Sequence, residues 1–156
     1  MAVLFSESKT KQNLMRAFAG EGQARNRYTF AAEQARKDGK PAIADIFLYT
    51  ADQERAHAGR YYELLKEASG TNIFIDGSYP VDETKTLVQL LRAAEHNEQE
   101  EAKDVYLAFA DVAKQEGFFE AAATFQQIAE IEAAHSQRFR KIAAVSYTHL
   151  RAHETT

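Results

Sequence analysis

The sequence contains no cysteine among its 156 residues. This absence excludes disulfide bonds, thiol catalysis and thiolate metal sites within the chain. Proline and glycine are scarce, with two and seven residues respectively, while Ala, Glu, Gln, Lys and Leu fill the long segments between them. Few residues therefore interrupt regular structure, and the composition favours helices. The length is typical of one domain that buries a substantial core.

Long apolar runs and clusters of positive charge are also missing. No stretch approaches the roughly 20 apolar residues that a membrane-spanning helix needs. The first residues do not show a basic region followed by an apolar run of secretory length. We therefore expect a cytoplasmic protein without a membrane partner. The net charge is -4, and no basic stripe is present to bind a phosphate backbone, so nucleic acid is not expected as a partner.

Four long segments have the pattern of helices. Gly39 and Gly117 are placed as C-terminal caps, and Pro41 is a favourable first helical residue. The one long connection covers the 13 residues 70–82. Two short links and one long crossover predict an all-α four-helix bundle, in which the crossover joins two helix hairpins. The predicted helices cover residues 10–37, 41–69, 83–116 and 118–144.

An internal repeat supports this arrangement. When the sequence is shifted by 78 positions, identical residues from the first half fall on residues of the second half. Two Glu-x-x-His pairs match in this register, which chance similarity between Ala- and Glu-rich helices hardly explains. The repeat predicts two related hairpins packed about a pseudo-two-fold axis. The main matching pairs are Tyr28 and Tyr106, Phe47 and Phe125, Glu54 and Glu132, His57 and His135, and Arg60 and Arg138.

The last twelve residues, 145–156, have no counterpart in the repeat and lack helical periodicity. We predict a single domain over residues 1–144, followed by a tail that is disordered or non-native. His149 and His153 stand four apart in this tail, the spacing at which two histidines on one helix bind a metal. The tail is nevertheless expected to take no part in function.

Acidic residues interrupt the apolar stripe of every predicted helix. On the fourth, Glu132 and His135 lie between apolar residues at helical spacing, and Glu54 and His57 do the same on the second. A single Glu-x-x-His motif is weak evidence, because an isolated glutamate often faces solvent. Two such motifs in one repeat register, with inward glutamates on the other two helices, are the ligand set of dinuclear carboxylate bundles. The added glutamates are Glu21, Glu98 and Glu101.

The charge of these stripes also points to metal. Five glutamates would meet in one interior, and the stripes carry no lysine to balance them. Unpaired, they would cost many kcal/mol or become protonated. Two divalent cations supply four positive charges and two trivalent cations supply six. Carboxylate oxygen and imidazole nitrogen suit iron or manganese, and the absence of thiolates argues against structural zinc. The sequence therefore predicts a pair of redox-active metal ions.

Four stretches of the sequence resemble the rubrerythrin family. They are A-G-E-G-Q-A-R-N-R-Y (19–28), T-A-D-Q-E-R-A-H (50–57), V-Y-L-A-F-A-D-V-A-K-Q-E-G-F (105–118) and I-A-E-I-E-A-A-H-S-Q-R-F (128–139). The resemblance covers residues 9–143 and implies a ferritin-like fold with two bound iron ions, although manganese or mixed-metal occupancy is compatible with the same ligands. The ligands that it implies are Glu21, Glu54, His57, Glu98, Glu101, Glu132 and His135.

Within this set, the resemblance implies that Glu54 and Glu132 bridge the two metals. The third predicted helix offers several glutamates, and those eight and five residues before Tyr106 match the family pattern. This spacing selects Glu98 and Glu101 over Glu95 and Glu100. Two roles are possible for Glu95. It could contact a metal ligand without binding the metal itself, or its side chain could lie in solvent.

The resemblance further implies a peroxidase that reduces hydrogen peroxide to water. In the family, one iron exchanges a carboxylate for a histidine as its oxidation state changes, which here corresponds to Glu101 and His57. Tyr28 and Tyr106 are implied to hydrogen-bond near the ligands, although both would also serve as plain core residues. These four residues are the candidate catalytic residues.

The usual family member carries a rubredoxin-like domain with a four-cysteine iron site, which these 156 residues lack. Either a separate rubredoxin or another donor protein supplies electrons, for example from NADH through a separate reductase, or the natural chain is longer. Ferritin-like iron oxidation or iron binding is an alternative function, and a metal-free helical interaction module is another. The resemblance also suggests a homodimer, in which the long crossover would allow helices to be exchanged.

Overall fold

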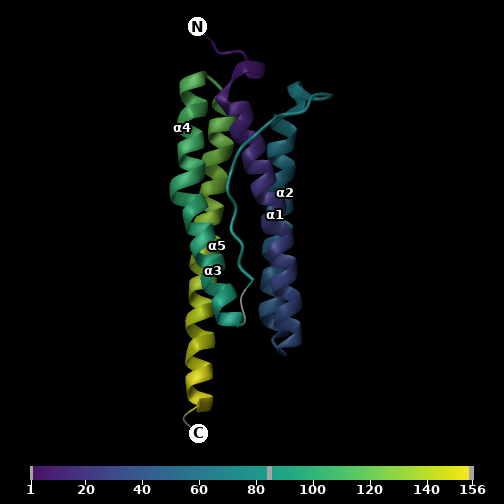
Figure 1. The fold of residues 1–156 in the computed structure, drawn as a ribbon. Helices are drawn as coiled ribbons and strands as arrows, with labels where there is room; N and C mark the ends of the chain where they lie inside the picture. Colours follow the sequence, from purple (N-terminus) through teal and green to yellow (C-terminus); the bar gives the residue numbers. More distant parts are fainter. Residues whose placement is uncertain (1, 84–85, 155–156) are drawn as a thin grey trace.

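A computed structural model describes the backbone of residues 2–83 and 86–154, and the side chains of residues 2–83 and 86–146. The first hairpin consists of α1 (Lys9–Lys37) and α2 (Pro41–Leu64). The second consists of a long composite helix and α5 (Phe119–Glu154). The composite helix contains α3 (Leu87–Glu100), η3 (Glu101–Val105) and α4 (Tyr106–Glu116). Figure 1 shows these rods packed side by side, which confirms the predicted all-α four-helix bundle.

One long crossover connects the two hairpins, as predicted. It runs along the length of the bundle from the end of α2 to the start of α3 (Figure 1). Short 3-10 helices, η1 (Phe5–Glu7) and η2 (Lys66–Ala68), flank the first hairpin. The crossover is bonded to α1, because Arg16 Nε donates to the Asp76 carbonyl at 3.0 Å and Tyr79 Oη donates to the Arg16 carbonyl at 2.9 Å. It is bonded to α3 through Asn97 Nδ2, which donates to Asp82 Oδ2 at 2.7 Å.

Capping residues define where several of the helices begin and end. Gly39 and Gly117 have φ values of 71° and 88°, a left-handed conformation that glycine adopts without steric cost. The Ser8 side chain accepts from the Lys11 amide and so caps α1. Thr86 and Gln89 form a reciprocal capping box at the start of α3. The predicted links between the helices of each hairpin are therefore short and sharply defined.

Three predicted helix ends differ from the structure. The second helix ends at Leu64 rather than near residue 69, because i→i+3 hydrogen bonds tighten the chain into η2. The third begins at Leu87 rather than near residue 83, because Thr86 caps its N-terminus. The fourth continues to Glu154 instead of ending near residue 144. No proline or glycine follows Gly117 to stop it, so the helical hydrogen bonds extend beyond the amphipathic pattern.

Residues 145–154 of the predicted tail belong to this helix. The side chains of His149 and His153, and the whole of residues 155–156, lie outside the described part of the chain.

The third helix also contains a feature that the sequence analysis did not predict. Its middle segment, η3, is a π-helix, in which backbone hydrogen bonds join residues five apart instead of four apart as in an α-helix. Glu21 and Tyr28 are seven residues apart in α1, whereas Glu98 and Tyr106 are eight apart across η3. The π-helix accommodates the extra residue, so Glu98 and Tyr106 keep the relative placement of their counterparts in α1.

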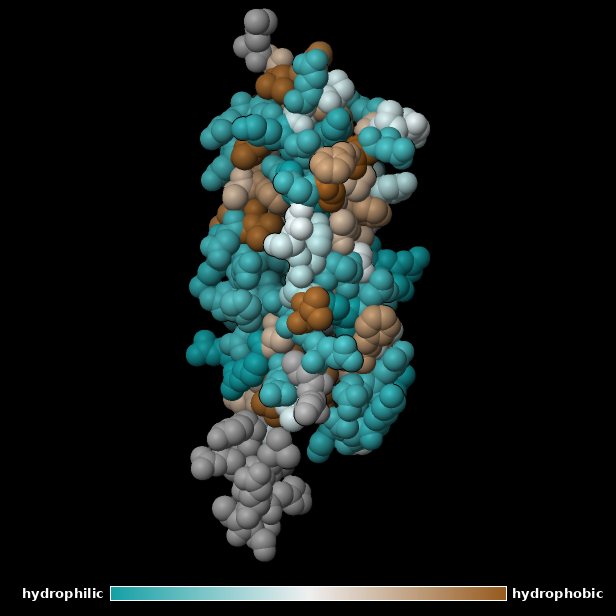
Figure 2. Space-filling model, in the orientation of Figure 1, coloured by the Kyte–Doolittle hydropathy of each residue, from teal (hydrophilic) through white to brown (hydrophobic). Residues whose placement is uncertain are grey.

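Two buried apolar clusters occupy the two ends of the bundle. One contains Tyr28, Phe47 and Phe139, whose rings stand 5.4–6.0 Å apart. The other is centred on Phe125, with Tyr61 at 5.3 Å and Tyr106 at 6.2 Å between ring centroids. On the face shown in Figure 2, apolar side chains appear singly or in small groups within a mainly hydrophilic surface. Among the described residues, no helix is sufficiently long and apolar to cross a membrane.

Candidate metal centre

Six of the seven predicted ligands meet between the two apolar clusters. Their ligand atoms form two groups of four, and within each group all atoms lie within 4.8 Å of one another. Both groups contain Glu54 and Glu132. The four glutamates are at most 1% exposed, and both histidines are buried. The first group adds Glu21 and His57, and the second adds Glu98 and His135.

The histidines direct the same ring atom toward the carboxylates. His57 Nδ1 lies 3.1 Å from Glu132 Oε1 and 3.7 Å from Glu21 Oε2. His135 Nδ1 lies 3.2 Å from Glu132 Oε2 and 3.5 Å from Glu98 Oε1. The rings stand 6.2 Å apart and are nearly parallel, at 22°. Because the Glu-x-x-His pairs of α2 and α5 occupy equivalent positions in the repeat, the site has the pseudo-two-fold symmetry of the fold.

Several buried carboxylate oxygens have no hydrogen-bond donor in the described part of the chain. They are Glu21 Oε2, Glu98 Oε2 and both oxygens of Glu54. A buried acceptor without a donor is costly, and a buried charge more so. Each group offers carboxylate oxygen and imidazole nitrogen, the donor set that suits iron or manganese. The residues present therefore fit a pair of metal ions, with Glu54 and Glu132 common to both groups.

The pKa shifts of the clustered carboxyl groups also indicate that positive charge would stabilise this site. Burial, followed by the charges of Glu21 and Glu98, raises the pKa of Glu54 well above its usual range. Burial and the charges of Glu98 and Glu54 raise the pKa of Glu132 in the same way. Burial alone would also raise the pKa of Glu98, but hydrogen bonds with Glu132, His135 and Tyr28 hold it below the usual value. Cations would keep all of these carboxylates ionised.

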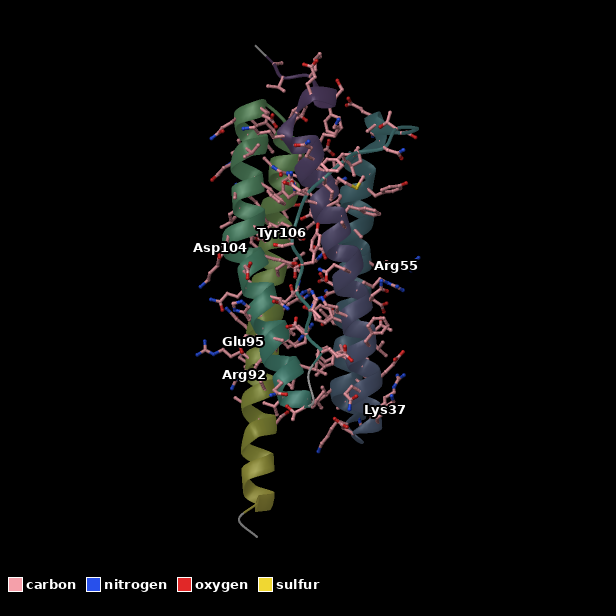
Figure 3. The ribbon with its side chains drawn as sticks, in the orientation of Figure 1. Lys37, Arg55, Arg92, Glu95, Asp104 and Tyr106 are labelled. Atoms are coloured by element: carbon pink, nitrogen blue, oxygen red, sulfur yellow. The ribbon has the colours of Figure 1, made fainter. Side chains whose placement is uncertain are left out.

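Two tyrosines reach across the bundle to support the carboxylates. Tyr28 Oη donates to Glu98 Oε1 at 2.8 Å, and Tyr106 Oη donates to Glu21 Oε1 at 2.6 Å. Burial, followed by nearby carboxylate charge, raises the pKa of both phenols well above the usual value. Both tyrosines therefore remain protonated donors. Figure 3 shows Tyr106 on the inner side of its helix, while Asp104 points outward.

Glu101 is placed differently from the other predicted ligands. It belongs to neither group of four, is only partly buried, and is the first residue of η3. It lines a cavity of about 570 Å³ between the crossover, α1 and the third helix, together with Tyr106 and Tyr79. Burial and the charges of Glu98 and Glu21 raise the pKa of Glu101 well above the usual value. The corresponding residue three positions after Glu21 is Ala24, so this carboxyl group breaks the symmetry of the site.

The competing glutamates of the third helix lie away from the centre. Glu95 forms an ion pair with Arg92 at 3.1 Å, and Glu100 is exposed beside His96 at 3.4 Å. Figure 3 shows Arg92 and Glu95 on the outer side of the bundle.

Sequence reasoning missed Gln53, whose Oε1 makes a short contact with His135 Nε2. Only its position next to Glu54 gave a hint of this contact, because the contact depends on how α2 packs against α5.

A four-helix bundle with paired Glu-x-x-His motifs and inward glutamates defines the ferritin-like dinuclear carboxylate proteins. Within that class, the family model for rubrerythrin matches residues 12–143. The chain belongs to the rubrerythrin family, whose members are di-iron proteins.

Similar proteins of known sequence and structure agree with this assignment. Rubrerythrin of Clostridium perfringens is 49% identical over 138 residues, which cover 87% of this chain and 70% of that protein. Rubrerythrin of Porphyromonas gingivalis is 46% identical over 137 residues, covering 88% of this chain and 67% of that protein. A fully reduced, all-ferrous structure of nigerythrin superposes with a TM-score of 0.77 at 29% identity, covering 90% of this chain and 71% of that one.

Proposed function

We propose that the protein is a di-iron peroxidase that reduces hydrogen peroxide to water with electrons from an external donor such as rubredoxin. One observation carries this proposal. Two four-residue ligand groups share Glu54 and Glu132, and an additional carboxyl group, that of Glu101, lies beside them in a cavity that small molecules can enter.

In the proposed centre, Glu21 and His57 would bind one iron, and Glu98 and His135 the other. When bound, the two irons would supply the two electrons that cleave the O–O bond of peroxide. Tyr106 and Tyr28 hold Glu21 and Glu98 in place through their hydroxyl groups. The apolar clusters on either side exclude bulk water from the carboxylates.

Reduction of peroxide to two water molecules consumes two electrons and two protons, so the site also needs a proton source. Glu101 lines the cavity, where its carboxyl group is positioned to pass a proton to a molecule that enters. We propose that Glu101 gives one of the two protons to a peroxide oxygen and that solvent in the cavity supplies the other. The resulting carboxylate is then available as a ligand, and family resemblance suggests that it alternates with His57 as the oxidation state changes.

Ferritin-like iron oxidation is the second candidate function. The two groups of four form a complete dinuclear ligand set without Glu101, and iron oxidation by dioxygen would not require this residue. The role of Glu101 therefore distinguishes the two functions. Manganese or mixed-metal occupancy, and a homodimer with or without exchanged helices, are compatible with either.

The proposed function is tested by anaerobic turnover. The reduced protein receives peroxide in the presence of rubredoxin, its reductase and NADH, and the oxidation of NADH is followed. The matched control is Glu100→Ala, which removes the neighbouring exposed carboxylate. We expect the wild-type and control proteins to sustain NADH oxidation.

Glu101→Ala should retain two bound irons and lose about 100-fold in peroxide turnover, the lower range for loss of a positioned proton donor. Full activity of Glu101→Ala, or no peroxide-dependent NADH oxidation by the wild type, would contradict the proposed peroxidase.

A further inference from the structure

The two histidines of the metal centre differ in what lies behind them. The outer nitrogen of His135, Nε2, contacts Gln53 Oε1 across the interface between α2 and α5. Gln53 Nε2 in turn donates to Tyr49 Oη at 3.2 Å. Because the amide nitrogen is used by Tyr49, the amide oxygen faces His135 as an acceptor. A proton on His135 Nε2 would complete this contact, and it would leave the lone pair of Nδ1 facing the carboxylates of Glu132, Glu54 and Glu98.

Gln53 is itself held in position by neighbouring residues. Arg138, one turn beyond His135 on α5, donates from Nη2 to Thr50 Oγ1 at 2.7 Å. Its guanidinium group also lies over the ring of Tyr49, 5.0 Å from the centroid. Since Tyr49 is half exposed, this contact restrains a side chain that would otherwise move freely. Gln53 therefore presents a fixed acceptor to His135.

His57 lacks an equivalent support. The internal repeat places Ile131 at the position of Gln53, 78 residues later. An isoleucine side chain cannot accept a hydrogen bond. In the described residues, the polar contacts of His57 all involve Nδ1, on the side of the carboxylates. Two side chains that the repeat makes equivalent therefore differ in their outer contacts.

We propose that Gln53 is a positioning residue that fixes the ring orientation and the tautomer of His135, a support that Ile131 does not give to His57. A histidine that donates its outer N–H to an acceptor is held in one tautomer and one ring orientation, and it becomes a more basic ligand. This inference rests on the proposed metal centre, but it does not depend on the reaction with peroxide.

The test uses Co²⁺ as the probe metal, because its visible absorption reports binding at each equivalent. Gln53→Leu removes the acceptor, Gln53→Glu retains an acceptor, and Ile131→Leu is the matched apolar control on the other half of the repeat. We expect Gln53→Leu to lower Co²⁺ affinity at one of the two sites by about 10–100-fold. Gln53→Glu and Ile131→Leu should bind both equivalents with affinities close to the wild type.

A second readout follows the proton itself. The Co²⁺-loaded wild type should show one paramagnetically shifted N–H resonance that exchanges slowly with water, from His135 Nε2. This resonance should persist in Gln53→Glu and Ile131→Leu and disappear in Gln53→Leu. The wild-type spectrum alone tests the inference, so it remains testable if Gln53→Leu fails to fold.

Three results would overturn the inference. They are a wild type without the slowly exchanging resonance, a folded Gln53→Leu with wild-type affinity at both sites, and equal losses in Gln53→Leu and Gln53→Glu. A wild type that binds no Co²⁺ would overturn the proposed metal centre as well, whereas wild-type affinity at both sites in every variant would overturn the inference alone.

Discussion

Each tyrosine at the metal centre supports a carboxylate that belongs to the other hairpin. Tyr28 of α1 donates to Glu98 of α3, and Tyr106 of α4 donates to Glu21 of α1. These bonds tie the two halves of the repeat together at the level of the site. Tyr61 is a different case, because its buried hydroxyl donates to none of the described carboxylates and its counterpart in the repeat is Phe139.

Replacing Tyr106 by Phe should therefore destabilise the metal-free protein by about 1–3 kcal/mol, because a buried Glu21 oxygen loses its donor. Tyr61→Phe is the matched control and should cost less, since the Tyr61 hydroxyl does not donate to a carboxylate of the centre. Denaturant unfolding of both variants measures the difference. Equal losses in the two variants would show that the bond to Glu21 does not stabilise the fold.

The raised pKa values of Glu54, Glu101 and Glu132 predict how the stability of the metal-free protein depends on pH. Each folded-state pKa lies above the ordinary value of 4.5, so the folded protein holds more protons than the unfolded chain above that pH. The free energy of unfolding should therefore fall as pH rises from about 4.5 toward neutrality. Glu54→Gln should flatten this dependence. A metal-free wild type that becomes more stable over this range would contradict the assigned shifts.

At the scale of elements, the π-helix η3 keeps Glu98 and Tyr106 in places equivalent to those of Glu21 and Tyr28, although one more residue separates them. α1 reaches from Glu21 to Tyr28 with a regular helix, while the third helix needs one residue more to reach from Glu98 to Tyr106. π-Helical turns inside α-helices occur frequently at functional sites. Here the turn begins at Glu101, the residue that breaks the symmetry between the two halves.

Deletion of the exposed residue Lys103 should convert η3 into a regular α-helix, because it restores the seven-residue spacing found in α1. Helix content by circular dichroism should stay close to the wild type, since both flanking helices keep their packing faces. Peroxide turnover should fall, because the deletion changes how Glu101 and Tyr106 are placed relative to each other at the cavity that both line. A deletion variant with full turnover would show that the π-helix is not needed for the position of Glu101.

Some features of the helices and their connections could be predicted from the sequence, and others could not. Helix number, the crossover and the glycine caps follow from local pattern, and the capping box of Thr86 and Gln89 was readable but missed. The π-helix left a signal too, because the 78-residue shift pairs Tyr28 with Tyr106 but pairs Glu21 with Gln99. The contact of Gln53 with His135, and the cavity beside Glu101, depend on how α2, α5 and the crossover pack. No local pattern carries that information.

The whole molecule places four nearly fully buried carboxylates between two apolar clusters. This arrangement opposes folding unless positive charge is present, since buried charges are costly without a partner. The clusters and the tyrosine bonds hold the bundle together, and metal binding then satisfies the orphaned oxygens. The architecture is therefore that of a scaffold built to hold a dinuclear site, whatever oxidant the centre uses.

The most direct test is an anaerobic equilibrium titration of the metal-free protein with Fe²⁺, with bound iron counted per chain. We expect saturation at two Fe²⁺ per chain, and loss of tight binding at both sites in Glu132→Gln, because Glu132 belongs to both ligand groups. Saturation at none or one, uptake of many irons per chain, or undiminished binding by Glu132→Gln would contradict a dinuclear centre bridged by this residue.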